Sequence, residues 1–171
     1  MSPPVISIVS KKNSGKTTLL EKLIPEMKQR GYRVGTIKHD THGFEIDHEG
    51  KDTWRHKRAG AVTVVISSPW KISLIKDVDE ELSIDALVSE YFADMDLVIT
   101  EGYKRAGKPQ IEVFRSRAHS APLHVKGQNN TLVAVMSDVP VDLGVPRFDI
   151  NDINALADFI ENTYVRQGGK Q

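Results

Sequence analysis

Apolar side chains along the first forty residues predict a strand, a helix and a second strand. Residues 5–9 form a short β-branched run that is typical of a buried strand. Residues 17–30 carry leucines at helical spacing, with Pro25 disturbing this helix and Gly31 ending it. Residues 32–38 form the second apolar run. This order predicts parallel strands joined by a crossover helix.

The rest of the chain continues the same alternation after a polar loop over residues 39–57, which has a short helix near its end. The expected elements are strands over 61–67, 70–77, 97–100, 110–114 and 132–136, and helices over 84–92 and 152–164 with Asn151 as candidate cap. Ser68-Pro69 separates the first two of these strands, which we expect to form a hairpin. The pattern therefore predicts an α/β fold with a mainly parallel core sheet.

Composition narrows the class of protein. The chain has 171 residues, 39% of them hydrophobic, which suits one domain with a sizeable core. Lys plus Arg and Asp plus Glu number 23 each, so net charge gives no general attraction to nucleic acid or to an acidic membrane. No apolar run approaches the ~20 residues of a membrane span. We therefore expect neither nucleic-acid nor membrane binding.

The chain contains no cysteine. This excludes disulfides, thiolate metal sites and cysteine nucleophiles. The first residues lack the basic start and apolar run of a signal peptide, so we expect a cytoplasmic protein. The Gly-rich end at 168–171 is expected to be a disordered tail.

Residues 10–17, with the sequence Ser-Lys-Lys-Asn-Ser-Gly-Lys-Thr, lie between the first strand and the first helix. They match the phosphate-binding P-loop pattern G-x-x-x-x-G-K-[ST], except that Ser10 replaces the first glycine. Gly15 allows close approach of the backbone to phosphate, Lys16 reaches the terminal phosphates, and the Thr17 hydroxyl is a ligand for Mg²⁺. An ordinary turn with a chance Gly-Lys-Thr is the alternative, but the flanking strand and helix favour the P-loop.

The P-loop predicts a set of nucleotide contacts. The expected residues are Lys11, Lys12, Asn13, Ser14, Gly15, Lys16, Thr17 and Thr18. Lys11 stands where some P-loop ATPases carry a second signature lysine, but with Lys12 beside it we favour general attraction to phosphate. The Cβ of Ser10 is expected to restrict the turn.

The metal partner follows from the end of the strand at which each carboxylate lies. Ligands in parallel sheets bind at the carboxyl ends of strands. Asp96 precedes the strand at 97–100, roughly 17 Å along it from Glu101. Glu101 follows this strand and has Gly102 beside it, so we assign Glu101 rather than Asp96 to the Mg²⁺ shell or its water. A turn carboxylate is the alternative interpretation.

The polar loop after the second strand starts at the same sheet edge. We expect His39 to contact the nucleotide and Asp47 to approach the metal. Four of the six histidines lie in residues 39–56, but their spacings match no zinc signature, so a nucleotide-facing loop is favoured over a transition-metal site.

Several motifs together resemble the molybdopterin-guanine dinucleotide biosynthesis protein B (MobB) family. The matching segments are residues 12–19, Ile37-Lys38-His39, Gly50-Lys51-Asp52-Thr53, Ala59-Gly60-Ala61, Glu101-Gly102-Tyr103-Lys104 and Phe148 to Ile153. Many families share the P-loop, whereas its combination with Ile-Lys-His, Gly-Lys-Asp and Glu-Gly-Tyr-Lys is much more specific. The resemblance covers nearly the whole chain. The family usually has glycine at the position of Ser10.

This resemblance implies a P-loop NTPase-like three-layer sandwich with extra strands, with residues 1–167 as a single nucleotide-binding domain. It further implies GTP and Mg²⁺ as cofactors and weak GTPase activity, for which Lys16 and Glu101 are the candidate catalytic residues. The implied task is assistance to the guanylyltransferase of molybdenum cofactor assembly, by a homodimer, with molybdopterin as a further candidate ligand.

Two basic segments have uses that the sequence leaves open. Residues 51–58, with Trp54 among them, are interpreted either as an anion-binding surface or as a solvated helix face, which is favoured. Lys104, Arg105 and Lys108 follow Glu101 and are candidates for contact with an anionic substrate or partner, or for solvation alone.

The choice of base is the least determined feature. The guanine-reading sequence Asn-Lys-x-Asp is absent, and Asp138 after a late strand is a candidate reader, although a turn residue is the favoured interpretation. The rival functions are an ATP-dependent kinase or ligase and a non-hydrolysing nucleotide-dependent adaptor. Competition between ATP and GTP for binding distinguishes the kinase or ligase from a GTP-binding protein. Absence of GTP turnover supports the non-hydrolysing adaptor.

Overall fold

The computed structural model describes residues 2–166, and the tail predicted at 168–171 lies outside them. The chain divides into two compact units. The larger unit comprises Met1–His39 and Ile84–Gln171, and the smaller unit comprises Asp40–Ser83. A single domain over 1–167 stays a prediction. No helix within residues 2–166 is long and apolar enough to cross a bilayer.

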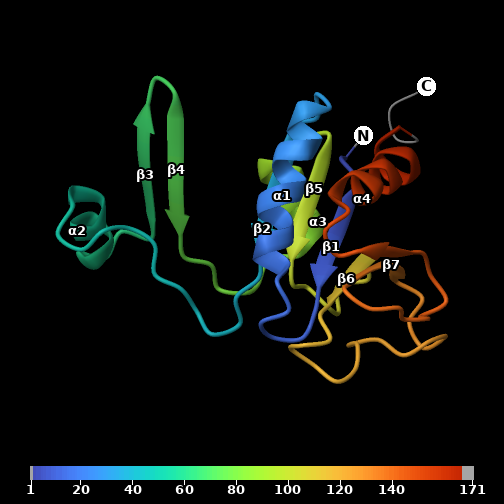
Figure 1. Cartoon of the computed structure of the whole chain (residues 1–171). Helices are drawn as coiled ribbons and strands as arrows, with labels where there is room; N and C mark the ends of the chain where they lie inside the picture. The colour runs from blue at the N-terminus through green and yellow to red at the C-terminus, as the bar shows by residue number, and fades with distance from the viewer. Residues whose placement is uncertain (1, 167–171) are drawn as a thin grey trace. The chain divides into compact units, whose positions relative to one another are not determined.

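The larger unit is built on a six-stranded sheet (Figure 1). Its strands are β1 Val5–Val9, β2 Val34–Lys38, β5 Leu97–Glu101, β6 Gln110–Phe114, β7 Leu132–Ser137 and β8 Arg147–Asp149. The spatial order is β2-β5-β1-β6-β7-β8, and every neighbouring pair is parallel. The predicted parallel core is therefore confirmed. Strand β8 was not predicted, because three residues with two charged ends show no strand pattern.

Helices cover both faces of this sheet. They are α1 Lys16–Gln29, α3 Ile84–Tyr91 and α4 Ile153–Ile160, and α4 continues into a π-helical turn, η1 Glu161–Val165. Ile6 and Ile8 of β1 belong to the core under α1 and α4. Val98 of β5, one position out of phase with that core, packs against Ile84 and Val88 of α3 on the other face. These layers form the predicted three-layer, P-loop NTPase-like sandwich.

Two details of the helices differ from expectation. Helix α1 continues through Pro25 to Gln29, since the missing amide removes only one hydrogen bond of the helix. The predicted cap Asn151 is wrong. The carboxylate of Asp152 caps α4 instead, accepting a hydrogen bond from the Ala155 amide at 3.0 Å. The Asn151 amide donates to Asp149, so this residue lies in the turn before the helix.

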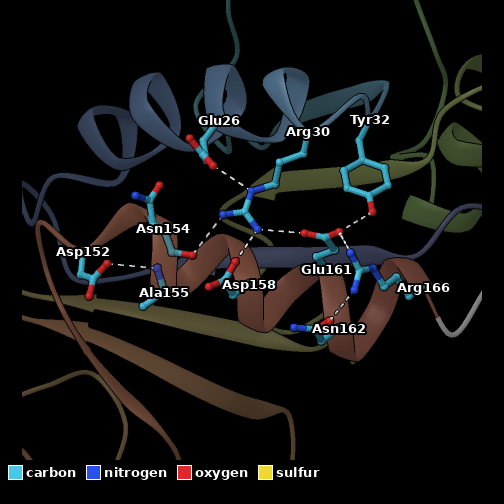
Figure 2. Close-up of polar contacts among 10 residues, drawn as sticks. All are labelled: Glu26, Arg30, Tyr32, Asp152, Asn154, Ala155, Asp158, Glu161, Asn162 and Arg166. Carbon is cyan, nitrogen blue, oxygen red and sulfur yellow. Dashed lines mark hydrogen bonds and ion pairs between the residues drawn. The ribbon is translucent and has the colours of Figure 1, made fainter.

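A cluster of charges joins α1 to the C-terminal helix (Figure 2). The guanidinium of Arg30 contacts Glu26 at 2.8 Å, Asp158 at 2.6 Å and Glu161 at 2.8 Å. Tyr32 donates its hydroxyl to Glu161 at 2.8 Å. Hydrogen bonds from Arg30 first, and then from Tyr32, lower the pKa of Glu161. The helix that begins at the P-loop is thereby held at its far end by charge-assisted contacts.

The smaller unit contains one helix and the predicted hairpin. Helix α2 spans Asp52–Arg58, and strands β3 Thr63–Ser68 and β4 Lys71–Lys76 pair antiparallel. Lys57 forms an ion pair with Asp77 directly after the hairpin. The hairpin carries large apolar side chains that are exposed, and Trp70 at its tip is 92% accessible.

Candidate nucleotide-binding site

The P-loop connects β1 to α1 through two residues with left-handed backbone. Asn13 has φ 59° and Gly15 has φ 92°, a conformation that glycine adopts without cost and asparagine tolerates. Gly15 is also the N-cap of α1, and no described side chain caps this helix end. The first amides of α1 therefore have no side-chain cap within residues 2–166, and uncapped amides at a helix start are the groups that bind an anion.

Ser10 replaces the usual glycine without distorting the loop. It is not among the described residues with positive φ, so a Cβ is tolerated at this position. The side chain is almost fully buried, and its hydroxyl donates to the Lys11 carbonyl at 2.6 Å. The same oxygen accepts a hydrogen bond from the Lys16 ammonium at 3.0 Å. Ser10 thus hydrogen-bonds the P-loop lysine from a backbone conformation that does not require glycine.

Lys16 lies in a strongly positive environment. Burial lowers the pKa of Lys16 below its ordinary value of 10.5, whereas Glu101 acts in the opposite direction. The charges of Lys104 and Lys38 lower this pKa further. Three lysines therefore lie near one carboxylate. Electrostatic attraction stabilises a bound polyanion here more than at an exposed surface.

Glu101 lies at the sheet edge predicted for it. As the last residue of β5 it stands opposite Ile8 of β1 and Lys38 of β2. The Thr17 hydroxyl lies 3.4 Å and 3.5 Å from the two carboxylate oxygens of Glu101. Asp96 lies at the other end of β5, where its carboxylate accepts from the Arg33 amide at 2.7 Å. The predicted positions of Glu101 and Asp96 at opposite ends of β5 are therefore confirmed, and the metal role of Glu101 stays a prediction.

The oxygens of Thr17 and Glu101 suit a hard cation. A direct hydroxyl–carboxylate hydrogen bond is typically about 2.7–2.8 Å, so the observed separation is wide. Mg²⁺ binds oxygen ligands at about 2.0–2.1 Å and usually retains several waters. A hydroxyl and a carboxylate facing each other across this wider gap fit such an ion, directly or through a bound water.

The other side chains predicted to contact the nucleotide differ in whether they are free to reach a ligand. The ammonium of Lys11 donates to the Ala121 carbonyl at 2.8 Å, so it faces a neighbouring loop. Ser14 is buried and donates to the Lys11 carbonyl at 3.1 Å. The remaining polar side chains are exposed: Lys12, Asn13 and Thr18.

His39 lies beside the site and stacks on Tyr103, with ring centroids 4.3 Å apart and an interplanar angle of 18°. Its amide donates to the Glu101 carbonyl at 3.0 Å. Gly102 has φ 99°, and a Cβ there would lie 3.3 Å from the Cβ of His39. The space beside the Gly102 backbone is therefore occupied by the side chain of His39.

The remaining candidates divide between the two units. Asp47 lies in the smaller unit, where Thr53 and the His48 amide hold the pKa of its carboxyl below the ordinary value. Its role as a metal ligand stays a prediction. In the larger unit Lys108 forms an ion pair with Asp85 at 2.5 Å, whereas Lys104 is exposed beside Lys16.

Sequence reasoning missed the loop between β6 and β7, residues 115–131, which we call the β6–β7 loop. The Arg115 guanidinium donates from Nε to the Ser14 carbonyl at 3.2 Å. Nε2 of His119 lies 2.6 Å from the Lys12 carbonyl. The rule that selected Glu101 also applies to Arg115, since it directly follows a strand, but the position of β6 beside β1 is a long-range feature.

Asp138, which directly follows β7, contacts this loop. Its carboxylate accepts from the amide of Ser116 at 2.8 Å and from the Ser116 hydroxyl at 3.3 Å. Both oxygens of Asp138 therefore anchor the β6–β7 loop, and its role as a reader of the base stays a prediction.

A buried polar network fixes the middle of the same loop. Glu112 of β6 is 1% exposed and accepts from the amides of Leu123 and His124. Nδ1 of His124 lies 2.7 Å from this carboxylate, and Nε2 lies 3.0 Å from the Gln110 side-chain oxygen. The Gln110 amide group donates to the Lys104 carbonyl, which turns its oxygen toward the imidazole. The loop that contacts the P-loop is thus tied to the sheet.

Comparison with known proteins agrees with this fold. The family model of molybdopterin guanine dinucleotide synthesis protein B, MobB, matches residues 5–138. The molybdopterin-guanine dinucleotide biosynthesis adapter protein of Escherichia coli (strain K12) is 36% identical, over 97% of this chain and 96% of its own length.

Solved structures give the same result. A crystal structure of molybdopterin-guanine biosynthesis protein B is 34% identical with a TM-score of 0.71, covering 92% of this chain and 97% of its own. The Bacillus subtilis MobB structure is 25% identical with a TM-score of 0.74, covering 94% and 98% of the two chains. On this combination of family model, relatives and fold, the chain belongs to the MobB family.

Proposed function

We propose that this protein binds GTP with Mg²⁺ at the P-loop, hydrolyses it slowly, and acts as an adapter in the biosynthesis of molybdopterin guanine dinucleotide by assisting the guanylyltransferase. The observation that carries the nucleotide proposal is the arrangement of Lys16, Thr17 and Glu101 at one sheet edge beside the open amides of α1. The adapter role is supported by relatives that bear this description over nearly their full length.

In this proposal the chain's own groups bind and orient the triphosphate. The first amides of α1 and the Lys16 ammonium hold the terminal phosphates, and Ser10 keeps the ammonium in place. Thr17 and Glu101 are the residues that hold the metal ion. A Mg²⁺ ion held at these oxygens would neutralise charge on the phosphates. In hydrolysis a water would attack the γ-phosphorus, the bond to the β–γ bridging oxygen would break, and GDP and phosphate would be released.

The nucleotide is tested by competition between GTP and ATP for the Mg²⁺-loaded protein. We expect GTP to displace a fluorescent guanine nucleotide at concentrations at least about tenfold lower than ATP, because a base contact of hydrogen-bonding quality contributes that much. A preference for ATP would favour the kinase or ligase alternative. Binding of GTP without turnover, even with the guanylyltransferase present, would favour the non-hydrolysing adaptor.

The metal role predicts the behaviour of Glu101→Gln. This change removes the negative charge beside Thr17 but keeps the size of the side chain, so Mg²⁺-dependent GTP hydrolysis should fall about tenfold or more. Hydrolysis is measured as phosphate release over a Mg²⁺ titration. Glu21→Gln, an exposed carboxylate on α1, is the matched control and should not change it. Unchanged Mg²⁺ dependence in Glu101→Gln would reject the metal role.

We further propose a homodimer that uses the β3–β4 hairpin. Isolated two-stranded hairpins are marginally stable in water. Here Val65 and Ile72, which the register places on one face of the hairpin, are 55% and 74% exposed, and Trp70 at the tip is 92% exposed, which is unusual for large apolar side chains. A second copy of the chain would cover these residues, consistent with the dimer that the family resemblance implies.

This surface predicts that Ile72→Glu shifts the protein from dimer to monomer, because a buried charge in an apolar interface is strongly unfavourable. Sedimentation equilibrium of wild type and variant measures the change. The control is Lys71→Glu, which places a carboxylate at an exposed position of the same strand but on its other face. A wild-type monomer, or an Ile72→Glu dimer as stable as wild type, would contradict this surface.

A further inference from the structure

Arg115 lies directly on the P-loop although it comes from another part of the chain. It follows β6, the strand that pairs with β1 on the side opposite β5. Its Nε donates to the Ser14 carbonyl at 3.2 Å. A Cβ on Gly15 would lie 2.9 Å from this nitrogen and 3.4 Å from Nη2. The guanidinium therefore packs against the backbone of Ser14 and Gly15, next to Lys16.

The guanidinium of Arg115 has no counter-charge in the described part of the chain. Other arginines contact carboxylates: Arg30, Arg33, Arg55, Arg58 and Arg166 all do so. Arg115 forms no ion pair with residues 2–166, and its two Nη groups make no hydrogen bond there. It is nevertheless half-buried. A partly desolvated cation with four unused N–H donors favours an anionic acceptor.

The β6–β7 loop holds Arg115 in this position before any ligand binds. Asp138 fixes the next residue, Ser116, through two hydrogen bonds. The Lys11 ammonium closes the contact from the P-loop side by donating to Ala121. The ammonium of Lys11, the second lysine of the P-loop, is therefore already hydrogen-bonded to the protein. A guanidinium held by its neighbours loses little side-chain freedom on binding, which strengthens each contact that it makes.

We propose that Arg115 is a further nucleotide-contacting residue, whose Nη groups donate to phosphate oxygens of the nucleotide in the P-loop while Nε holds the Ser14 carbonyl. This inference rests on the proposed nucleotide binding. The amides at the start of α1 bind phosphate, and the guanidinium lies against the same turn of backbone. A planar fork of donors matches phosphate geometry.

The test compares three replacements of Arg115. Arg115→Lys keeps the charge, Arg115→Gln keeps a neutral donor for the Ser14 carbonyl, and Arg115→Ala removes both. Arg117→Ala is the control, because Arg117 lies two residues away in the same loop and is exposed. Kd for GTP and for GDP is measured by titration calorimetry with Mg²⁺ present, and a thermal melt of each variant checks the fold.

If Arg115 contacts phosphate, Arg115→Ala and Arg115→Gln should weaken the binding of GTP and GDP by about tenfold or more. Arg115→Lys should weaken binding less, and the affinity of Arg117→Ala should stay within about twofold of wild type. If Arg115→Gln keeps wild-type affinity while Arg115→Lys loses it, the residue only supports the Ser14 carbonyl and the proposal is overturned. Affinity within about twofold in all three variants also overturns it. The comparison of Gln with Lys still decides if the alanine variant does not fold.

The same titrations separate this inference from the proposed function. Lys16→Ala is measured alongside as the reference for loss of the P-loop contact. Wild type that binds no nucleotide would overturn both proposals. Loss of binding in Lys16→Ala with normal binding in every Arg115 variant would overturn only the role of Arg115.

Discussion

Replacement of Lys16 by alanine is expected to weaken GTP binding by about a hundredfold or more and to leave the fold intact. The ammonium is the charged group at the end of the P-loop, and its one described hydrogen bond is to the Ser10 hydroxyl at 3.0 Å. Its removal deletes a charge-assisted contact to phosphate, yet leaves the apolar core untouched. Titration calorimetry with GTP measures the loss, and the far-ultraviolet circular dichroism spectrum should match wild type.

The pH dependence of GTP binding checks the same residue. Burial lowers the pKa of Lys16 in the free protein, and a bound polyphosphate favours the ammonium form, so its pKa rises on binding. GTP affinity should therefore fall as pH rises through the lowered pKa, and Lys16→Ala should lose this alkaline dependence. Lys22→Ala, an exposed lysine on α1, serves as control. Similar GTP affinity in wild type and Lys16→Ala would contradict the phosphate role.

Removal of Glu112 is expected to cause the largest loss of stability in the β6–β7 region. Its carboxylate is 1% exposed and accepts hydrogen bonds from the amides of Leu123 and His124, with the His124 ring at 2.7 Å. Glu112→Ala leaves these donors buried without an acceptor and also opens a void. Each buried donor left without its acceptor costs about 1–3 kcal/mol in the free energy of unfolding.

Urea unfolding followed by circular dichroism measures this loss. Glu21→Ala removes an exposed carboxylate from α1 of the same unit and should change the free energy of unfolding by no more than about 0.5 kcal/mol. A Glu112→Ala protein as stable as the control would show that the network contributes little. The β6–β7 loop would then need another anchor.

The sequence was sufficient to predict the core of the site because its determinants are local. The β-branched run of β1, the Gly-Lys-Thr turn and the leucines of α1 follow one another within one short segment. Glu101 lies far away in the chain, but one general property of parallel sheets brings its strand end to the P-loop and places Asp96 at the opposite edge.

The features that escaped prediction depend on tertiary position. Strand β8 has too few residues for a periodic signal, and its pairing with β7 defines it. The role of Arg115 requires β6 to lie beside β1, which no local pattern indicates. Arg30 appears in the sequence as an ordinary helix-end cation, yet it joins α1 to Asp158 and Glu161. Ser10 could not be evaluated until its hydrogen bond to Lys16 was known.

The central claim is that the P-loop and Glu101 together hold a guanine nucleotide and its metal. A crystal structure of the protein with a non-hydrolysable GTP analogue and Mg²⁺ tests it most directly. We predict terminal phosphates against the Lys16 ammonium and the first amides of α1, and Mg²⁺ against the Thr17 hydroxyl with Glu101 bound directly or through water. An analogue bound away from the P-loop, or a metal ion with neither Thr17 nor Glu101 in its shell, would contradict the account.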